Sequence, residues 1–113
     1  MKMRPFPLLA IAVAALIPFG LAGHAQAGPP PAAVVRIANF TFTPPMLAVR
    51  PGTTVTWIND DDIPHTVVAN DKSFRSPVLD TGDRFSFTFA KAGQFGYFCS
   101  LHPHMTGKIV VKA

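Results

Sequence analysis

From residue 34 onward, hydrophobic and polar positions alternate in short runs that end at proline, glycine or aspartate. Residues 84–89 alternate strictly and place three phenylalanines on one face, while residues 53–58 are rich in β-branched and aromatic side chains. Such patterns are typical of strands in a sheet with one buried face. Further strands are predicted at residues 34–42, 46–49, 65–69, 77–79, 94–98 and 107–112. No run of useful length has helical periodicity, so the pattern predicts an all-β fold, an antiparallel sandwich of about seven to eight strands.

The first 27 residues have a different pattern. Lys2 and Arg4 precede an apolar run over residues 8–21, and small residues flank Gln26 before a predicted cut after Ala27. These are the three regions of a secretory signal peptide, and the run is too short for a comfortable membrane span. We therefore predict a signal peptide at residues 1–27, a proline-rich lead-in at 28–33 and one domain at 34–113. The protein is expected in the periplasm, without a membrane anchor.

Removing the signal also changes the charge. The formal net charge of +4 for 113 residues falls to about +2 for the remaining 86, because Lys2 and Arg4 are lost. The other basic residues are scattered singly, which does not match a nucleic-acid-binding stripe. A domain of this size has little room for a deep substrate cleft, so a large multi-step enzyme is excluded. A monomer is expected.

Cys99 is the single cysteine of the chain. Small exported proteins usually carry disulfides, so a lone cysteine is an intermolecular link, an inert buried residue or a group whose sulfur has another use. Its neighbours favour the third interpretation. His102 and Met105 follow at intervals of three residues, in the predicted loop between the last two strands, and His65 begins an earlier strand.

One thiolate, two imidazoles and one thioether form a recognisable metal-binding set. Structural zinc sites do not use thioether, and magnesium or calcium would need oxygen ligands. Two histidines and one cysteine in a plane, with a weak axial methionine, describe a blue-copper electron-transfer site. We therefore predict one type 1 copper ion held by His65, Cys99 and His102, with Met105 as the axial ligand.

These motifs resemble the cupredoxins, and most closely the amicyanin, pseudoazurin and plastocyanin group. The resemblance extends from Phe40 to Val111 and includes the Cys-x-x-His-x-x-Met spacing of amicyanin-like members, together with Phe42, Pro44, Pro51, Gly52, Trp57, Asn59, Asp61, His65, Gly82, Phe89, Tyr97, Pro103 and Gly107. It implies a Greek-key β-sandwich with copper at one end that carries single electrons between periplasmic proteins. It also implies that His102 lies near the surface as the electron exit, beside a small docking patch that includes Leu101 and Pro103.

Two positions depart from the family pattern. Thr66 follows the first histidine ligand, where most relatives have an asparagine whose side chain ties this loop to the cysteine loop. A threonine hydroxyl can form hydrogen bonds of the same kind. His104 stands where amicyanin-like relatives have an apolar residue, and we expect it to be an exposed residue beside the site with no role in it.

Other side chains have simpler interpretations. Asp60, Asp61 and Asp62 lack the spacing of a calcium loop and are read as a solvated turn. Trp57 and the phenylalanines are assigned to the core. Met46 either lines the apolar patch around the site or packs in the core.

The sequence thus predicts an electron carrier and not an enzyme. Its transient redox partners would be a dehydrogenase, a cytochrome c, an oxidase or a copper reductase such as nitrite reductase. A periplasmic copper-binding carrier or buffer with little redox turnover is the alternative, kept mainly because of Thr66. A hydrolase that uses Cys99 and His102 is disfavoured, since the loop is tight and a thioether has no role in hydrolysis.

Overall fold

The computed structural model describes residues 31–113. The predicted signal peptide, and the lead-in up to residue 30, lie outside the described residues. The first strand begins at Ala32, two residues earlier than the predicted domain boundary, because Ala32 and Ala33 pair with Thr54 and Val55.

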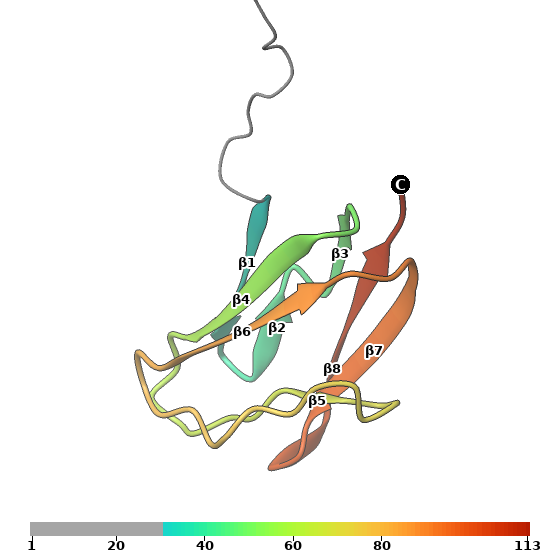
Figure 1. The fold of residues 1–113 in the computed structure, drawn as a ribbon. Coiled ribbons are helices and arrows are strands. Elements are labelled where there is room, and N and C mark those ends of the chain that lie inside the picture. Colours follow the sequence, from blue (N-terminus) through green and yellow to red (C-terminus); the bar gives the residue numbers. More distant parts are fainter. Residues whose placement is uncertain (1–30) are drawn as a thin grey trace, which may run out of the picture.

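Eight strands form two sheets that face each other as a sandwich (Figure 1). The strands are β1 (Ala32–Ala38), β2 (Thr41–Thr43), β3 (Met46–Val49), β4 (Thr53–Asn59), β5 (Val68–Ala69), β6 (Arg84–Phe89), β7 (Gly93–Cys99) and β8 (His102–Val111). One sheet has the order β2-β1-β4-β6, and the other has the order β3-β8-β7-β5. The predicted all-β sandwich is confirmed.

Two strand pairs within the described part of the chain are parallel, a detail that the predicted antiparallel arrangement lacks. β1 runs parallel to β4, and β3 runs parallel to β8. After β2 the chain passes through Pro44 and Pro45 to the other sheet, where Met46 pairs with Lys108. Each parallel pair therefore joins strands that are distant in the sequence, which short-range alternation does not reveal.

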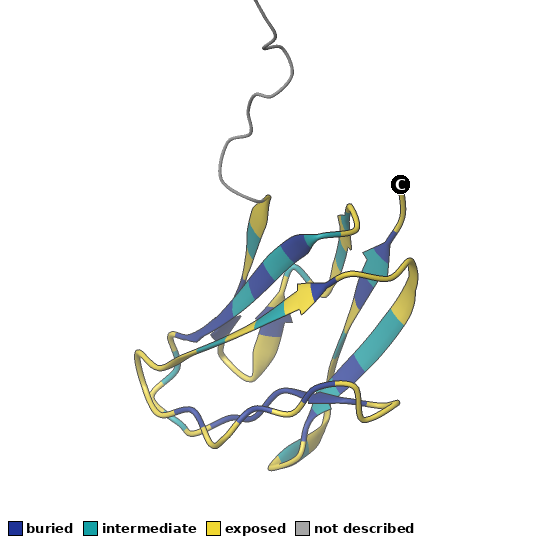
Figure 2. Ribbon diagram, in the orientation of Figure 1, coloured by how far each residue is buried: buried dark blue, intermediate teal, exposed yellow. Residues whose placement is uncertain are grey.

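The core lies between the sheets and contains a cluster of aromatic side chains around Trp57. Buried and half-buried positions alternate along β4 (Figure 2), so that Val55 and Trp57 point inward and are fully buried. Phe89 is buried with its ring centroid 6.4 Å from that of Trp57, and Phe85 and Phe87 pack against the same cluster from β6. The predicted single face of phenylalanines is confirmed.

The segment between β4 and β6 is less regular than predicted. The strand expected at residues 65–69 is reduced to β5, and the one expected at 77–79 is reduced to an isolated bridge between His65 and Leu79. Pro64 and Pro77 lack the N–H group that a continuous ladder needs. The bridge still fixes His65, because its N–H donates to Leu79 O at 3.0 Å and Leu79 N–H donates back at 2.8 Å.

Candidate metal centre

The β7–β8 hairpin lies at the end of the sandwich opposite the C-terminus (Figure 1). Phe98 pairs with Thr106, whereas Cys99 pairs with His102, so residues 103–105 bulge out of the ladder. Ser100 and Leu101 form the turn between the strands. The predicted ligand loop is therefore shorter than expected: His102 and Met105 belong to β8, because pairing resumes directly across the turn.

Three of the predicted ligand atoms converge. Cys99 Sγ lies 3.8 Å from His65 Nδ1 and 3.6 Å from His102 Nδ1, and the three ligand atoms lie within 4.8 Å of one another. Cys99 and His65 are fully buried, while His102 is half-buried. The geometry therefore presents one sulfur and two imidazole nitrogens to a common point.

These separations fit ligands of one first-row metal ion. With a metal–sulfur bond of about 2.3 Å and a metal–nitrogen bond of about 2.0–2.1 Å, an angle of about 110–120° at the metal places the two ligand atoms roughly 3.6–3.8 Å apart. Both sulfur–nitrogen distances fall in this range. The donor set is also soft, as thiolate and imidazole sites for copper are.

Met105 is buried in the bulge, with 6% of its surface exposed, and belongs to the core cluster. A buried position on this hairpin is compatible with an axial ligand and equally with packing. The axial role therefore stays a prediction.

A carboxylate contacts the ring nitrogen of His65 that faces away from the sulfur. Asp61 Oδ2 lies 2.9 Å from His65 Nε2, which leaves Nδ1 free to face the sulfur. A hydrogen bond from Phe40 N–H and a second from His65 lower the pKa of Asp61 to about 2. Carboxylates in this place fix the tautomer and the orientation of a ligating imidazole.

The solvated-turn interpretation of the acidic run is wrong for Asp61. Asp60 pairs with Arg36 at 2.8 Å on the surface, and Asp62 is exposed, but Asp61 turns inward to His65. The available signal was its position four residues before a predicted histidine ligand. In an irregular loop, a spacing of four residues does not determine whether the aspartate side chain points toward the histidine.

Thr66 connects the two loops that carry the predicted ligands. Its hydroxyl accepts a 2.7 Å hydrogen bond from Ser100 N–H and lies 2.7 Å from Ser100 Oγ. Its own N–H donates to Cys99 Sγ at 3.3 Å, and its hydroxyl lies 3.8 Å from the same sulfur. Thr66 thus forms the tie between loops that the resemblance assigns to an asparagine.

The surroundings of Cys99 lower the pKa of its thiol. Burial raises its pKa, but the hydrogen bond from Thr66 N–H and the contacts with His65 and His102 outweigh that effect and lower the pKa to about 6. The lowered pKa favours the thiolate, which is the metal-binding form.

Apolar side chains surround the half-buried His102. Phe40 and Leu101 are each 47% exposed, and Pro103 and His104 are exposed beside them. The expected exposure of His104 is confirmed. Met46 is 62% exposed, so of its two interpretations core packing is excluded.

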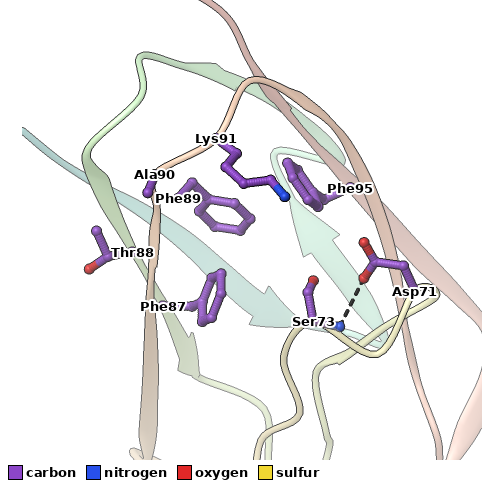
Figure 3. Close-up of a pocket in the computed structure, with 8 residues that line it drawn as sticks. All are labelled: Asp71, Ser73, Phe87, Thr88, Phe89, Ala90, Lys91 and Phe95. Carbon is purple, nitrogen blue, oxygen red and sulfur yellow. Dashed lines mark hydrogen bonds between the residues drawn. The ribbon is translucent and has the colours of Figure 1, made fainter.

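A separate hollow of about 240 Å³ opens on the flank of the sandwich (Figure 3). Phe87, Phe89 and Phe95 line it, and Asp71 and Lys91 stand at its edge. None of the predicted metal ligands reaches it.

The fold and the donor set together define a cupredoxin, and the family comparison agrees. The Cupredoxin-like domain family matches residues 9–111, so the chain belongs to this family. Its cofactor is one copper ion.

Within the family the chain is similar to amicyanins. Amicyanin from Paracoccus denitrificans is 40% identical over 86 residues, which cover 72% of this chain and 66% of that protein. Amicyanin-alpha from Methylorubrum extorquens is 31% identical over 110 residues, which cover 93% of this chain and 92% of that one. A solved structure of a purple cupredoxin from Nitrosopumilus maritimus superposes with a TM-score of 0.69 at 37% identity, and the match covers 71% of this chain and 99% of that one.

Residues 31–113 contain no helix with the length and apolar character needed to cross a membrane.

Proposed function

We propose that this protein is an exported carrier of single electrons, in which His65, Cys99 and His102 would hold copper strongly and Met105 would be a fourth, weaker ligand. The observation that carries the proposal is the convergence of Cys99 Sγ with two Nδ1 atoms at 3.8 and 3.6 Å. When bound, copper supplies the Cu(I)/Cu(II) couple.

The residues of the chain keep the ligands in one arrangement for both oxidation states. Asp61 orients the ring of His65, and the hydroxyl of Thr66 joins the two ligand-bearing loops. The thiolate also accepts the N–H of Thr66. Ligands that are fixed by the fold move little when the charge of the metal changes, which favours fast electron transfer.

The half-buried His102 is the proposed exit for the electron. It is the ligand with the most exposed ring, and apolar side chains such as Phe40 and Leu101 flank it. A small apolar patch suits redox partners that must leave quickly. We place the protein in the periplasm, where a dehydrogenase, a cytochrome c or a copper reductase would exchange electrons with it.

The alternative, a copper carrier with little redox turnover, rested mainly on the threonine at position 66. The hydroxyl of Thr66 makes the bonds to Ser100 that keep the two loops together. That observation favours a rigid site over one built to release its metal.

The decisive experiment is the visible absorption and EPR spectrum of the Cu(II)-loaded protein. A thiolate-to-copper band with a narrow hyperfine splitting is expected, and Cys99→Ser should abolish it. His102→Ala should also abolish it, while His104→Ala, on the same hairpin, should leave it intact. A spectrum of ordinary tetragonal copper in the unchanged protein would refute the electron carrier.

The axial ligand and the alternative function need separate measurements. Met105→Leu should change the reduction potential, whereas Met46→Leu, which alters an exposed methionine, should not. Fast copper release to an acceptor, combined with slow electron self-exchange, would favour the carrier instead.

A further inference from the structure

The two histidines of the site are held in different ways. His65 is fixed at both ring nitrogens, with Nδ1 toward Cys99 Sγ and Nε2 on Asp61 Oδ2. Within residues 31–113, the ring of His102 has one polar contact, from Nδ1 to the same sulfur at 3.6 Å. Among the described residues, no carboxylate or carbonyl accepts a hydrogen bond from its other nitrogen and so sets the ring plane. Something else must restrain a half-buried ring at the surface.

Two aromatic rings pack against His102: that of His65, which is itself a proposed ligand, and that of Phe40. The ring centroid of Phe40 lies 4.9 Å from that of His102 and 5.5 Å from that of His65, and the planes cross at 89° in both pairs. Edge-to-face contacts at these distances are attractive and directional. One phenyl ring therefore touches both imidazoles.

The backbone at Phe40 is strained. Asn39 and Phe40 form the two-residue turn between Ala38 and Thr41, which pair across the β1–β2 hairpin. Their φ angles are 53° and 57°, the left-handed values of a type I′ turn. Asparagine suits the first position, but the second favours glycine, and a phenylalanine there is an outlier.

A hydrogen bond maintains this conformation. Phe40 N–H donates to Asp61 Oδ2 at 3.0 Å, and the same oxygen lies 2.9 Å from His65 Nε2. The carboxylate thus holds the turn that presents the phenyl ring and also holds one of the two rings that the phenyl contacts. Strain that the surrounding structure maintains is a sign of function.

We infer that Phe40 is a positioning residue for the copper site: its phenyl ring, presented by a strained turn anchored on Asp61, restrains the ring of His102, whose Nε2 has no hydrogen-bond partner among residues 31–113. This inference rests on the proposed function, because it assigns His102 as a ligand.

The test compares Phe40→Gly with Phe40→Ala. Both remove the phenyl ring, but only glycine relieves the positive φ. Copper loss to an excess of chelator should be faster in both variants by about tenfold, the lower end of effects seen when the partners of metal ligands are removed. Val34→Ala provides the control, since Val34 is equally exposed at 46% and lies on β1.

Two copper-free measurements separate positioning from folding. The ring protons of His102, followed by NMR, should show increased motion in both Phe40 variants and not in Val34→Ala. Denaturant unfolding should find Phe40→Gly more stable than Phe40→Ala, because the strain of the turn is relieved. The glycine variant is then expected to be more stable than the alanine variant, and yet to lose copper as fast.

Two outcomes would overturn the role of Phe40. Unchanged copper loss and unchanged motion of His102 in both variants would overturn the inference. So would faster copper loss in the alanine variant alone, because the backbone would then be the cause. If the unchanged protein lacks a thiolate-to-copper band, the proposed function itself fails, and that outcome is distinct from these.

Discussion

Replacing Thr66 by valine tests whether one hydroxyl joins the two loops of the site. Valine keeps the shape of threonine but cannot accept the 2.7 Å hydrogen bond from Ser100 N–H, nor contact Ser100 Oγ. Thr66 is 5% exposed, so its own oxygen is shielded from water. The substitution therefore removes the tie without leaving a cavity.

The expected loss of stability follows from the bonds that disappear. A buried donor left without a partner costs about 1–3 kcal/mol, and Ser100 is exposed enough for water to recover part of that. We expect a loss of about 1.5 kcal/mol in the free energy of unfolding of the copper-free protein. For a domain of this size, that lowers the Tm by roughly 6–12 °C.

Thr56→Val is the matched control. The Thr56 hydroxyl lies 2.7 Å from Ser86 Oγ, which is the same chemistry on the solvent face of β4 and β6. Both groups reach water, so the change should stay within about 0.5 kcal/mol. Denaturant unfolding of the two variants measures the difference. Equal losses at both positions would refute the tie.

The same variant should lower the reduction potential. Hydrogen bonds to the sulfur withdraw electron density and so favour Cu(I), and Thr66→Val removes a hydroxyl 3.8 Å from Cys99 Sγ while leaving the N–H at 3.3 Å. A long bond of this kind contributes about 0.5–1 kcal/mol, which for one electron corresponds to a decrease of about 20–45 mV. Voltammetry of the copper-loaded protein would contradict this if the potential rose.

Three further predictions concern the residues around the site. Gly107→Ala should destabilise the fold by about 1–3 kcal/mol, because a Cβ there would lie 2.3 Å from the phenol of Tyr97; unfolding at the wild-type midpoint would contradict this. Asp61→Asn should weaken copper binding by about 10–100-fold, whereas the exposed Asp62→Asn should not, and competition with a chelator measures both. In the copper-free protein, burial raises the pKa of Cys99 but hydrogen bonds outweigh it and lower the pKa from 9.0 to about 6. Because the thiol has a lower pKa in the folded protein than in the unfolded chain, its ionisation stabilises the fold. The free energy of unfolding should therefore rise from pH 6 to 9, and this added stability should be lost as the pH falls through 6. Thiolate absorbance that appears only near pH 9 would contradict this prediction.

Much of the fold could be predicted because its signals are local. Alternation identified β4 and β6 together with the inward positions of Trp57 and Phe89. Cys99 and His102 are three residues apart, and any tight hairpin keeps such positions close. Where prolines interrupt the chain between β4 and β6, one predicted strand is reduced to β5 and the other to an isolated bridge, because alternation cannot show which N–H groups find partners.

The features that could not be predicted depend on contacts between distant segments. The parallel pairing of β1 with β4 requires knowledge of which strands become neighbours. Three successive aspartates predict a solvated turn, and only the path of that turn decides that Asp61 faces His65. Phe40 carries no local sign of its role, since its contacts lie on two other segments of the chain.

The site thus combines a local half and a distant half. The hairpin brings Cys99 and His102, and the segment after β4 brings His65. The two halves are joined by protein hydrogen bonds, chiefly those of Thr66 to Ser100 and to Cys99 Sγ. Since these bonds and the pairing of β5 with β7 set the sulfur–nitrogen separations, the fold determines the ligand geometry, and the metal does not have to impose it. A loss of fold stability at Thr66 should therefore be accompanied by a change at the metal, whereas an equal loss produced elsewhere in the sandwich should leave the spectrum of the site unchanged.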